Sequence, residues 1–398
     1  MTVWDDLIGQ AEAVEVLRDA SIAAGKIVAD HRSGTVDGVR TGQMTHAWLF
    51  TGPPGSGRSV AARALAAALQ CDTAGCDSCP ACHTVRTRTN ADVHMVVPDG
   101  LSISVQEMRN IVLTAARAPS GGRWQVVVVE DADRLTEAAA NALLKAIEEP
   151  PARTVFLLCA PSTHPDDVPV TIRSRCRVVT LRTPPAAAVA AVLVGEGIDA
   201  ERAEWAAQAS QGHVGRARRL ARDEQARERR AAVLAIPASL TTMQACLAAA
   251  DRLVRAAEEE AAAFAAEHND AEKESLAQAM GAGGTGKGTA AATRSAGAAL
   301  KDLERKQKSR TTRAQRDALD RALVDLAAFY RDVLLDQVGA QVAPAHPEAA
   351  ADVRRLTRLR PEGVLTRLDA VLACREALEL NVKPRIAVEA MTTALRLP

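Results

Sequence analysis

Aromatic side chains are scarce in this sequence, whose 398 residues include four phenylalanines, four tryptophans and one tyrosine. Hydrophobic residues still make up 47% of the chain, and alanine dominates them, so the cores must be built largely from small side chains. This composition favours closely packed helices. Because nucleic-acid bases stack on aromatic side chains, it also argues against a module that binds nucleic acid through interleaved aromatic residues.

An excess of either charge is also missing, because 49 lysines and arginines balance 49 aspartates and glutamates. No overall basic field therefore attracts nucleic acid. Any contact with DNA must be local, or must be made by partner proteins.

Long apolar runs are absent as well. No stretch approaches the roughly 18 apolar residues of a membrane span. The start, Met1–Asp6, lacks the basic segment and apolar core of a secretory signal. We therefore expect a soluble, cytoplasmic protein without a membrane partner.

Cysteine is present, and half of the eight residues crowd into one short segment. Cys71, Cys76, Cys79 and Cys82 have the spacing C-x4-C-x2-C-x2-C, whereas the other four are scattered. In a reducing cytosol, a tight cluster indicates metal ligands and scattered cysteines behave as small core residues. Four thiolates can surround Zn²⁺ as a closed tetrahedron. The pattern therefore predicts a structural zinc site, with four unrelated thiols as the alternative.

Strand and helix patterns alternate in the first part of the chain. Short runs without helical periodicity predict strands at 47–50, 93–97, 125–129 and 155–159. Between them, helices are expected over 60–69, after the capping residue Ser104 as far as 116, and after Thr136 as far as 149. Strands separated by helices predict an α/β domain with a parallel sheet, whose ligands lie at the carboxyl ends of the strands.

Strand patterns disappear after about Pro184, and the rest of the chain is expected to be all-α. Glycine and proline breaks divide it into a small helical domain at 183–237 and a larger one at 238–398, after an α/β domain at 1–182. Within the last domain, residues 281–298 are rich in glycine, alanine and threonine. We expect a flexible insertion there.

A glycine-rich turn, Gly52-Pro53-Pro54-Gly55-Ser56-Gly57-Arg58-Ser59, follows the first predicted strand and precedes a helix. This context is typical of a phosphate-binding loop. Gly52, Gly55 and Gly57 would let backbone amides face phosphate oxygens, and Ser59 could hold Mg²⁺. Arg58, however, stands where such loops carry lysine, and arginine lacks the compact ammonium group that reaches between terminal phosphates. ATP with Mg²⁺ is the expected ligand if one binds, and a turn shaped only by ancestry is the alternative.

Acidic residues follow the strand at 125–129, in the order Glu130-Asp131-Ala132-Asp133. At the carboxyl end of a buried strand, Glu130 and Asp131 are placed to hold magnesium and to polarise water. Acidic residues at strand ends are also common as mere solubilising groups. Together with the glycine-rich loop, they favour the ancestry of a nucleotide site.

Several segments of this chain match one known family. They are Trp4–Gln10, Thr45–Gly52, the four clustered cysteines, Asn141–Pro151 and Thr171–Cys176. Together they resemble the delta-prime and gamma/tau family of clamp-loader subunits in bacterial DNA polymerase III, which are AAA+ proteins. The resemblance implies an AAA+ P-loop domain with a five-stranded parallel sheet and a zinc insertion, a helical lid, and a helical collar that joins subunits into a five-membered ring.

The resemblance also implies a role for Arg175. In this family the arginine of Ser-Arg-Cys acts in trans on the ATP of a neighbouring subunit, and the matching residues here are Ser174, Arg175 and Cys176. Without the resemblance, an arginine beside a strand is more often part of a surface ion pair.

Departures from the family pattern distinguish between its members. ATP-hydrolysing members have lysine at Arg58, Asp-Glu at Glu130-Asp131, a serine- or threonine-rich sensor where Ala160 lies, and a second sensor arginine near Gly215, where Arg216 comes one place late. The departures favour a structural ring subunit that does not hydrolyse ATP. Implied partners are the gamma/tau and delta subunits, the sliding clamp and primer-template DNA. A gamma/tau-type ATPase and a zinc-dependent nucleic-acid-binding module remain the alternatives.

Overall fold

The computed structural model describes residues 2–33, 43–98, 100–121, 123–279 and 289–397. The chain divides into two compact units, Met1–Ala221 and Arg222–Pro398, and each is described by itself. The predicted α/β domain and the helices after Pro184 lie together in the first unit as far as residue 221. The three-part division at 182 and 237 stays a prediction.

Five parallel strands form the sheet of the first unit, in the order β2-β3-β4-β1-β5. They are β1 (Ala47–Thr51), β2 (Val93–Val96), β3 (Gln125–Val129), β4 (Thr154–Ala160) and β5 (Arg177–Thr180). Every residue of β1, β3 and β4 is buried, which explains why these strands read as apolar runs without alternation. The predicted fold class, a five-stranded parallel α/β domain followed by helices, is confirmed.

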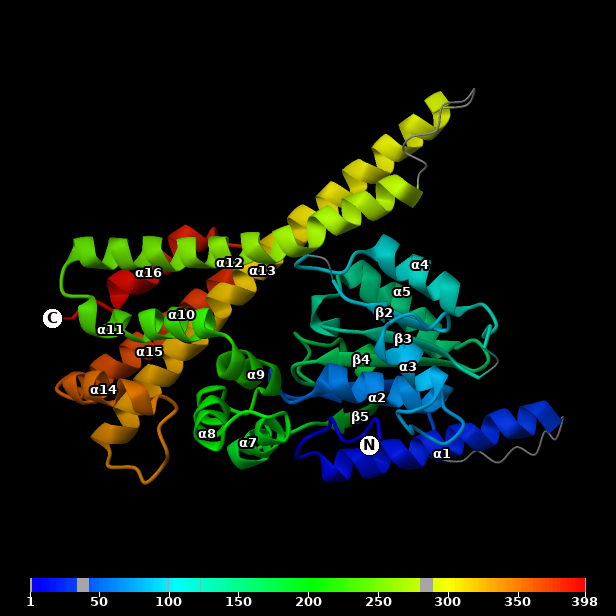
Figure 1. The fold of residues 1–398 in the computed structure, drawn as a ribbon, viewed down its shortest axis with the longest axis horizontal. Coiled ribbons are helices and arrows are strands. Elements are labelled where there is room, and N and C mark those ends of the chain that lie inside the picture. The colour runs from blue at the N-terminus through cyan, green and yellow to red at the C-terminus, as the bar shows by residue number, and fades with distance from the viewer. Residues whose placement is uncertain (1, 34–42, 99, 122, 280–288, 398) are drawn as a thin grey trace. The chain divides into compact units, whose positions relative to one another are not determined.

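Alternate residues of each strand face two separate cores. On one face, Trp48 and Phe50 pack with α1 (Ala11–Ser33) and α2 (Arg58–Gln70). On the other face, Leu49 packs with α4 (Val105–Ala115) and α5 (Glu137–Glu148). Figure 1 shows the two helical layers on either side of the sheet, with α3 (Pro80–Arg86) beside α2. The sheet is thus covered by helices on both faces, and the loops that follow the strands lie at the edge where the strands have their carboxyl ends.

Helix caps fix where two of these helices begin. The Ser104 hydroxyl accepts the backbone N–H of Glu107 at 3.3 Å, and the Thr136 hydroxyl accepts that of Ala139 at 3.3 Å. Both caps were predicted from the sequence, because a hydroxyl at this position satisfies an amide that has no partner within the helix. Between β4 and β5 lies the short α6 (Val170–Arg173), and α7 (Ala186–Gly195), α8 (Ala200–Ala209) and α9 (Val214–Arg222) complete the first unit.

The second unit is entirely helical. Its helices are α10 (Glu224–Leu234), α11 (Ile236–Ser239), α12 (Met243–Ala279), α13 (Thr289–Gln337), α14 (Ala350–Leu356), α15 (Pro361–Glu379) and α16 (Pro384–Ala394). Leu326, Phe329 and Tyr330 of α13 are fully buried at the centre of its core. Among the described residues, no helix combines the length and the apolar character needed to span a lipid bilayer.

The expected insertion at 281–298 differs from the structure over its second half. Residues 289–298 are helical and form the start of α13. Their alanines, which suggested a linker, have the highest helix propensity of any residue, so composition alone misjudged this stretch. Residues 281–288 of the expected insertion lie outside the described residues.

A buried polar cluster ties α10 to α13 and to the segment before α14. Arg230 is 5% exposed and pairs with Glu348 and with Asp325, the latter at 3.5 Å. His346 is fully buried, and its Nε2 lies 3.0 Å from the carbonyl oxygen of Asp325, so Nε2 must carry the proton. Its Nδ1 therefore accepts from the Arg230 guanidinium at 2.5 Å.

Replacing Arg230 should destabilise the second unit. In Arg230→Met, Asp325 and Glu348 lose a cation in a buried setting, so we expect a loss of about 3–5 kcal/mol in the free energy of unfolding. Urea unfolding followed by far-UV circular dichroism measures this loss. The matched control is Arg252→Met in α12, where the arginine is exposed. Equal stabilities of the two variants would contradict the assignment.

Candidate functional site

The glycine-rich loop lies between β1 and α2, and α2 begins at Arg58. Gly55 and Gly57 have φ of 87° and 94°, in the left-handed region that favours glycine. A Cβ on Gly55 would lie 2.6 Å from the Cβ of His213, so His213 packs directly on the loop. A Cβ on Gly57 would meet nothing within 4 Å. One side of the loop is therefore closed by His213, and the backbone at Gly57 is open.

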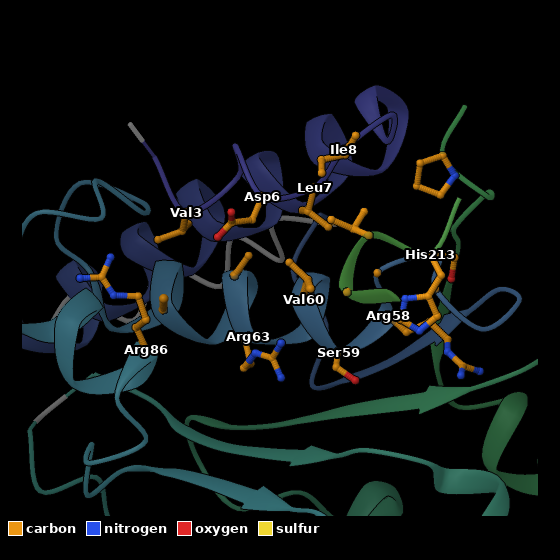
Figure 2. Close-up of a pocket in the computed structure, with 18 of the residues that line it drawn as sticks. Val3, Asp6, Leu7, Ile8, Arg58, Ser59, Val60, Arg63, Arg86 and His213 are labelled. Atoms are coloured by element: carbon orange, nitrogen blue, oxygen red, sulfur yellow. The ribbon is translucent and has the colours of Figure 1, made fainter. Parts of the chain in front are cut away.

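A cavity of about 720 Å³ lies beside this loop in the first unit. Four residues of the predicted nucleotide site line it, namely Gly55, Gly57, Arg58 and Ser59, and so does the predicted metal ligand Cys82. Gly52, Glu130 and Asp131 do not line it. Figure 2 shows the loop helix α2 as the floor of the cavity, with the N-terminal segment above it and His213 at one end. The volume is of the size that small-molecule sites have.

Two polar atoms of the loop are buried without a hydrogen-bond partner. They are Nη1 of Arg58 and Oγ of Ser56, and Ser56 is only 2% exposed. A buried donor without a partner costs free energy, so native proteins keep few of them. An anionic ligand in the cavity would supply acceptors for these two donors.

The predicted acidic pair is engaged by arginines of the same unit. Glu130 accepts from Nη1 of Arg63 at 2.8 Å, and Asp131 lies 3.9 Å from Arg134. Asp133 is half-buried, and burial together with the charge of Asp131 raises the pKa of its carboxyl. Glu130, the residue predicted to hold Mg²⁺, is thus already paired with Arg63 of α2.

Polar residues near the predicted sensor positions, Ala160 and Gly215, form hydrogen bonds or ion pairs within the same unit. Ser162, after β4, donates its hydroxyl hydrogen to Asp167 at 2.5 Å. Gly215 lines the cavity, and the backbone N–H of Arg216 donates to Nδ1 of His213 at 3.2 Å. Arg218 lines the cavity as well, and its Nε lies 2.7 Å from Glu196.

Sequence reasoning missed several walls of the cavity. Val3, Asp6, Leu7 and Ile8 line it from the N-terminal segment, and His213 lines it from the start of α9. The resemblance covered Trp4–Gln10, but nothing in the spacing placed that segment above the loop. Contacts between residues so far apart in the chain leave no local pattern in the sequence.

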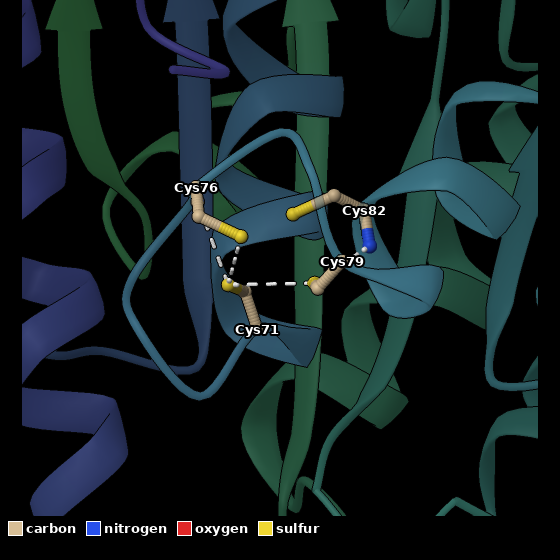
Figure 3. Close-up of side chains that lie close together, drawn as sticks. All are labelled: Cys71, Cys76, Cys79 and Cys82. Atoms are coloured by element: carbon tan, nitrogen blue, oxygen red, sulfur yellow. Dashed lines mark hydrogen bonds between the residues drawn. The ribbon is translucent and has the colours of Figure 1, made fainter. Parts of the chain in front are cut away.

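The four clustered cysteines come together where α2 is followed by α3: Cys71 caps the end of α2, Cys76 and Cys79 lie in the connecting loop, and Cys82 lies in α3. Their sulfur atoms all lie within 4.8 Å of one another, and Cys71 Sγ lies 3.7 Å from Sγ of both Cys76 and Cys79 (Figure 3). Zinc–sulfur bonds of about 2.3 Å place the sulfurs of a tetrahedron about 3.8 Å apart. The donor set and its spacing therefore fit a structural Zn²⁺ held by Cys71, Cys76, Cys79 and Cys82.

The thiols of the cluster differ in their surroundings. Hydrogen bonds from Ser78 and Thr73 lower the pKa of the Cys76 thiol to about 5. Burial raises the pKa of Cys82. The four thiols therefore differ in how readily they release the proton that a bound metal must displace.

Arg175 lies at the edge of the sheet opposite the loop. It precedes β5, whose first residue, Arg177, pairs with Trp48 near the start of β1, whereas the glycine-rich loop follows the end of β1. Nη2 of Arg175 lies 2.7 Å from Glu148, and Nη1 donates to the Thr171 carbonyl at 2.9 Å. Its side chain is 39% exposed. The strands separate Arg175 from the chain's own loop by about 13 Å or more.

Comparison with known proteins finds relatives for part of this unit. Residues 35–185 match the sequence profile of a family described as DNA polymerase III, delta subunit. The delta-prime subunit of DNA polymerase III from Haemophilus influenzae is 40% identical over 144 residues, which are 35% of this chain and 43% of that protein. Residues 35–185 are therefore similar to the delta-prime and gamma/tau family of clamp-loader subunits.

Members of both types of this family match the chain. The tau subunit of Bacillus subtilis is 30% identical over 178 residues, which are 44% of this chain and 28% of that protein. The chain spans less than half the length of these two relatives. Among solved structures, the match to a gamma subunit-related protein of Thermotoga maritima covers 88% of this chain and 93% of that protein, with a TM-score of 0.39 and 16% identity. Because this TM-score is low, the fold is assigned from the order of the strands in the sheet and not from this structural match.

We expect one zinc ion per chain. Elemental analysis of the freshly purified protein measures it, and Cys79→Ser should lose the metal and the local fold, because three thiolates leave the tetrahedron open. The matched control is Cys246→Ser in α12, outside the cluster. Fresh wild-type protein without zinc would contradict the assignment.

Proposed function

We propose that the chain is a delta-prime-type subunit of the DNA polymerase III clamp loader. In this proposal it is a structural member of the ring with a degenerate ATP site, and it supplies Arg175 to a neighbouring ATPase subunit. Its partners are the gamma/tau and delta subunits, the sliding clamp and, through the complex, primer-template DNA. Because this assembly acts in replication, the proposal includes a cytoplasmic location.

The observation that carries the proposal is the charge arrangement at the loop. Arg58 replaces lysine, and Arg63 neutralises Glu130, which stands at the metal-holding position. Phosphoryl transfer depends on positioned cations and on a metal bridging the terminal phosphates. A site whose carboxylate is already paired, and whose lysine is missing, is poorly suited to hold Mg²⁺ and to stabilise the transferring group. This supports a subunit that does not hydrolyse ATP.

The isolated chain should turn over ATP at a negligible rate. Steady-state hydrolysis of Mg·ATP by the purified chain measures it. The control is Arg58→Ala, which should leave the background rate unchanged because no turnover depends on the loop. Turnover at the rate of a gamma/tau subunit, abolished by Arg58→Ala, would overturn the proposal.

That outcome would favour the second candidate, a gamma/tau-type ATPase. One observation supports it: the loop keeps Gly55, Gly57 and Ser59 around a cavity large enough for a nucleotide. Equilibrium binding of Mg·ATP separates the two properties. Binding without turnover fits the degenerate site, whereas binding with turnover fits the ATPase.

The position of Arg175 supports a role outside its own site. Because the parallel strands carry it to the edge opposite the loop, its guanidinium has no access to a nucleotide bound by the same chain. Its side chain is partly exposed, and its bond to Glu148 is a half-exposed ion pair, which contributes about 1 kcal/mol or less. A phosphate of a neighbouring subunit could displace Glu148 at small cost.

Arg175→Ala should leave the fold and ring assembly intact but lower clamp- and DNA-stimulated ATPase and clamp loading by the reconstituted complex. Arginine fingers contribute roughly 10³–10⁵ in rate. The observed loss should be smaller, because a ring has several ATP sites and this chain would complete one. Arg175→Lys should restore little, because an ammonium group cannot reproduce the planar fork of donors.

The matched control for Arg175→Ala is Arg182→Ala, which removes an arginine whose side chain is 79% exposed and paired with Glu12. That variant should load clamps at the wild-type rate. If Arg175→Ala assembles normally and behaves like Arg182→Ala, Arg175 is an ordinary surface charge and the trans role is wrong.

A further inference from the structure

The N-terminal segment Val3–Gln10 forms a wall of the cavity without being a helix or a strand. Val3, Asp6, Leu7 and Ile8 line the cavity, and Figure 2 shows them above α2. The first helix, α1, begins only at Ala11. A wall made of irregular backbone keeps its place only through contacts with other segments.

One end of this segment is attached to the cysteine loop. The backbone N–H of Val3 donates to the carbonyl of Gly75 at 3.1 Å, and Nε1 of Trp4 donates to the carbonyl of Ala74 at 3.2 Å. Trp4 is 4% exposed. A Cβ on Gly75 would lie 2.5 Å from Cγ2 of Val3 and 3.1 Å from Nε1 of Trp4. The N-terminal segment and the cysteine loop are therefore so close at Gly75 that a side chain there would collide with Val3.

The other end is held by a different element. The Gln10 side chain donates to the carbonyl of Arg182 at 2.6 Å and to that of Ser56 at 3.2 Å, and it accepts the N–H of Arg182 at 3.2 Å. Gln10 is 5% exposed. This attachment involves Ser56 of the glycine-rich loop and Arg182, which follows β5, and it does not involve the cysteines.

The backbone of the cysteine loop is held in an unfavourable conformation at the point of contact. Ala74, Gly75 and Asp77 have φ of 55°, 104° and 57°. A left-handed conformation costs a non-glycine residue roughly 1–2 kcal/mol. Cys71 and Cys76 flank the contact residues, and the N–H of Cys76 donates to Sγ of Cys71 at 3.5 Å. The shape of the contact thus depends on how the cysteines are held together.

We propose that the metal-bound cysteine cluster positions the N-terminal wall of the cavity, with Gly75 as the positioning residue. The metal holds Cys71 and Cys76 together, and the carbonyls of Ala74 and Gly75 then hold Trp4 and Val3. Without metal, the segment is released at Val3 and Trp4 but stays attached at Gln10. The proposal rests on metal binding by the four cysteines, and it requires neither ATP turnover nor assembly into a ring.

Fluorine NMR of the full chain labelled with 5-fluorotryptophan tests this directly. The sequence has four tryptophans, so the spectrum should contain four signals, and Trp4→Phe assigns one of them. Removing zinc with a chelator should shift or broaden the Trp4 signal. Trp48 in β1 and Trp205 in α8 are internal controls whose signals should stay in place.

Gly75→Ala separates the contact from the metal. It keeps all four cysteines, so zinc content should stay at one per chain while the Trp4 signal moves as in the metal-free protein. The matched control is Gly197→Ala, where φ is 87° but a Cβ would meet nothing within 4 Å. That variant has the same backbone strain and should leave the Trp4 signal unchanged.

Three results would overturn the proposal. The first is a Trp4 signal that does not respond to metal removal, and the second is a Gly75→Ala protein with a wild-type Trp4 signal. The third is a chain that binds no zinc, which would leave the proposed clamp-loader role untouched. If Gly75→Ala does not fold, Trp4→Phe serves instead: removing the indole donor should speed amide exchange at Val3 by about tenfold or more, while exchange at Arg182, whose N–H donates to the Gln10 side chain, should stay unchanged.

Discussion

The shared direction of the five strands is the constraint on which the charged features of the first unit depend. Because the strands are parallel, everything that follows a strand lies at one edge of the sheet and everything that precedes a strand lies at the other. The glycine-rich loop and Glu130 follow β1 and β3, whereas Arg175 precedes β5. One sheet thus presents a phosphate-type site on one edge and an accessible arginine on the opposite edge.

Arginine side chains determine the character of the phosphate-type edge. Arg63 lies one turn beyond the loop on α2 and pairs with Glu130, while Arg58 places a nitrogen without a hydrogen-bond partner beside the cavity. An anion can be attracted to such a site, but the carboxylate that a metal would need is already engaged. Retained loop shape together with altered charge is the combination that the proposed degenerate ATP site requires.

Local signals in the sequence predicted four of the five strands of the first unit, β1 to β4, and the helices α2, α4 and α5. The strand at Gln125–Val129 and the caps at Ser104 and Thr136 depend on neighbouring residues, so pattern and hydrogen-bonding chemistry were sufficient. The walls of the cavity depend on contacts such as that between Gln10 and Arg182, which are 172 residues apart, and no local pattern encodes them. The stretch at 289–298 was misjudged because alanine is common in linkers and also favours helices. The cysteine cluster was predictable because its four ligands lie within residues 71–82 of the sequence.

The central claim is that this chain has a degenerate site of its own and acts on the site of a neighbour. A structure of the reconstituted clamp loader, trapped with Mg²⁺, ADP and a beryllium fluoride phosphate mimic, tests both halves together. The account predicts that Arg175 leaves Glu148 and lies within hydrogen-bond distance of the mimic bound to the adjacent subunit, while Glu130 stays paired with Arg63 and binds no Mg²⁺. Arg175 still paired with Glu148, together with Mg²⁺ and the mimic in the cavity beside Arg58, would contradict it.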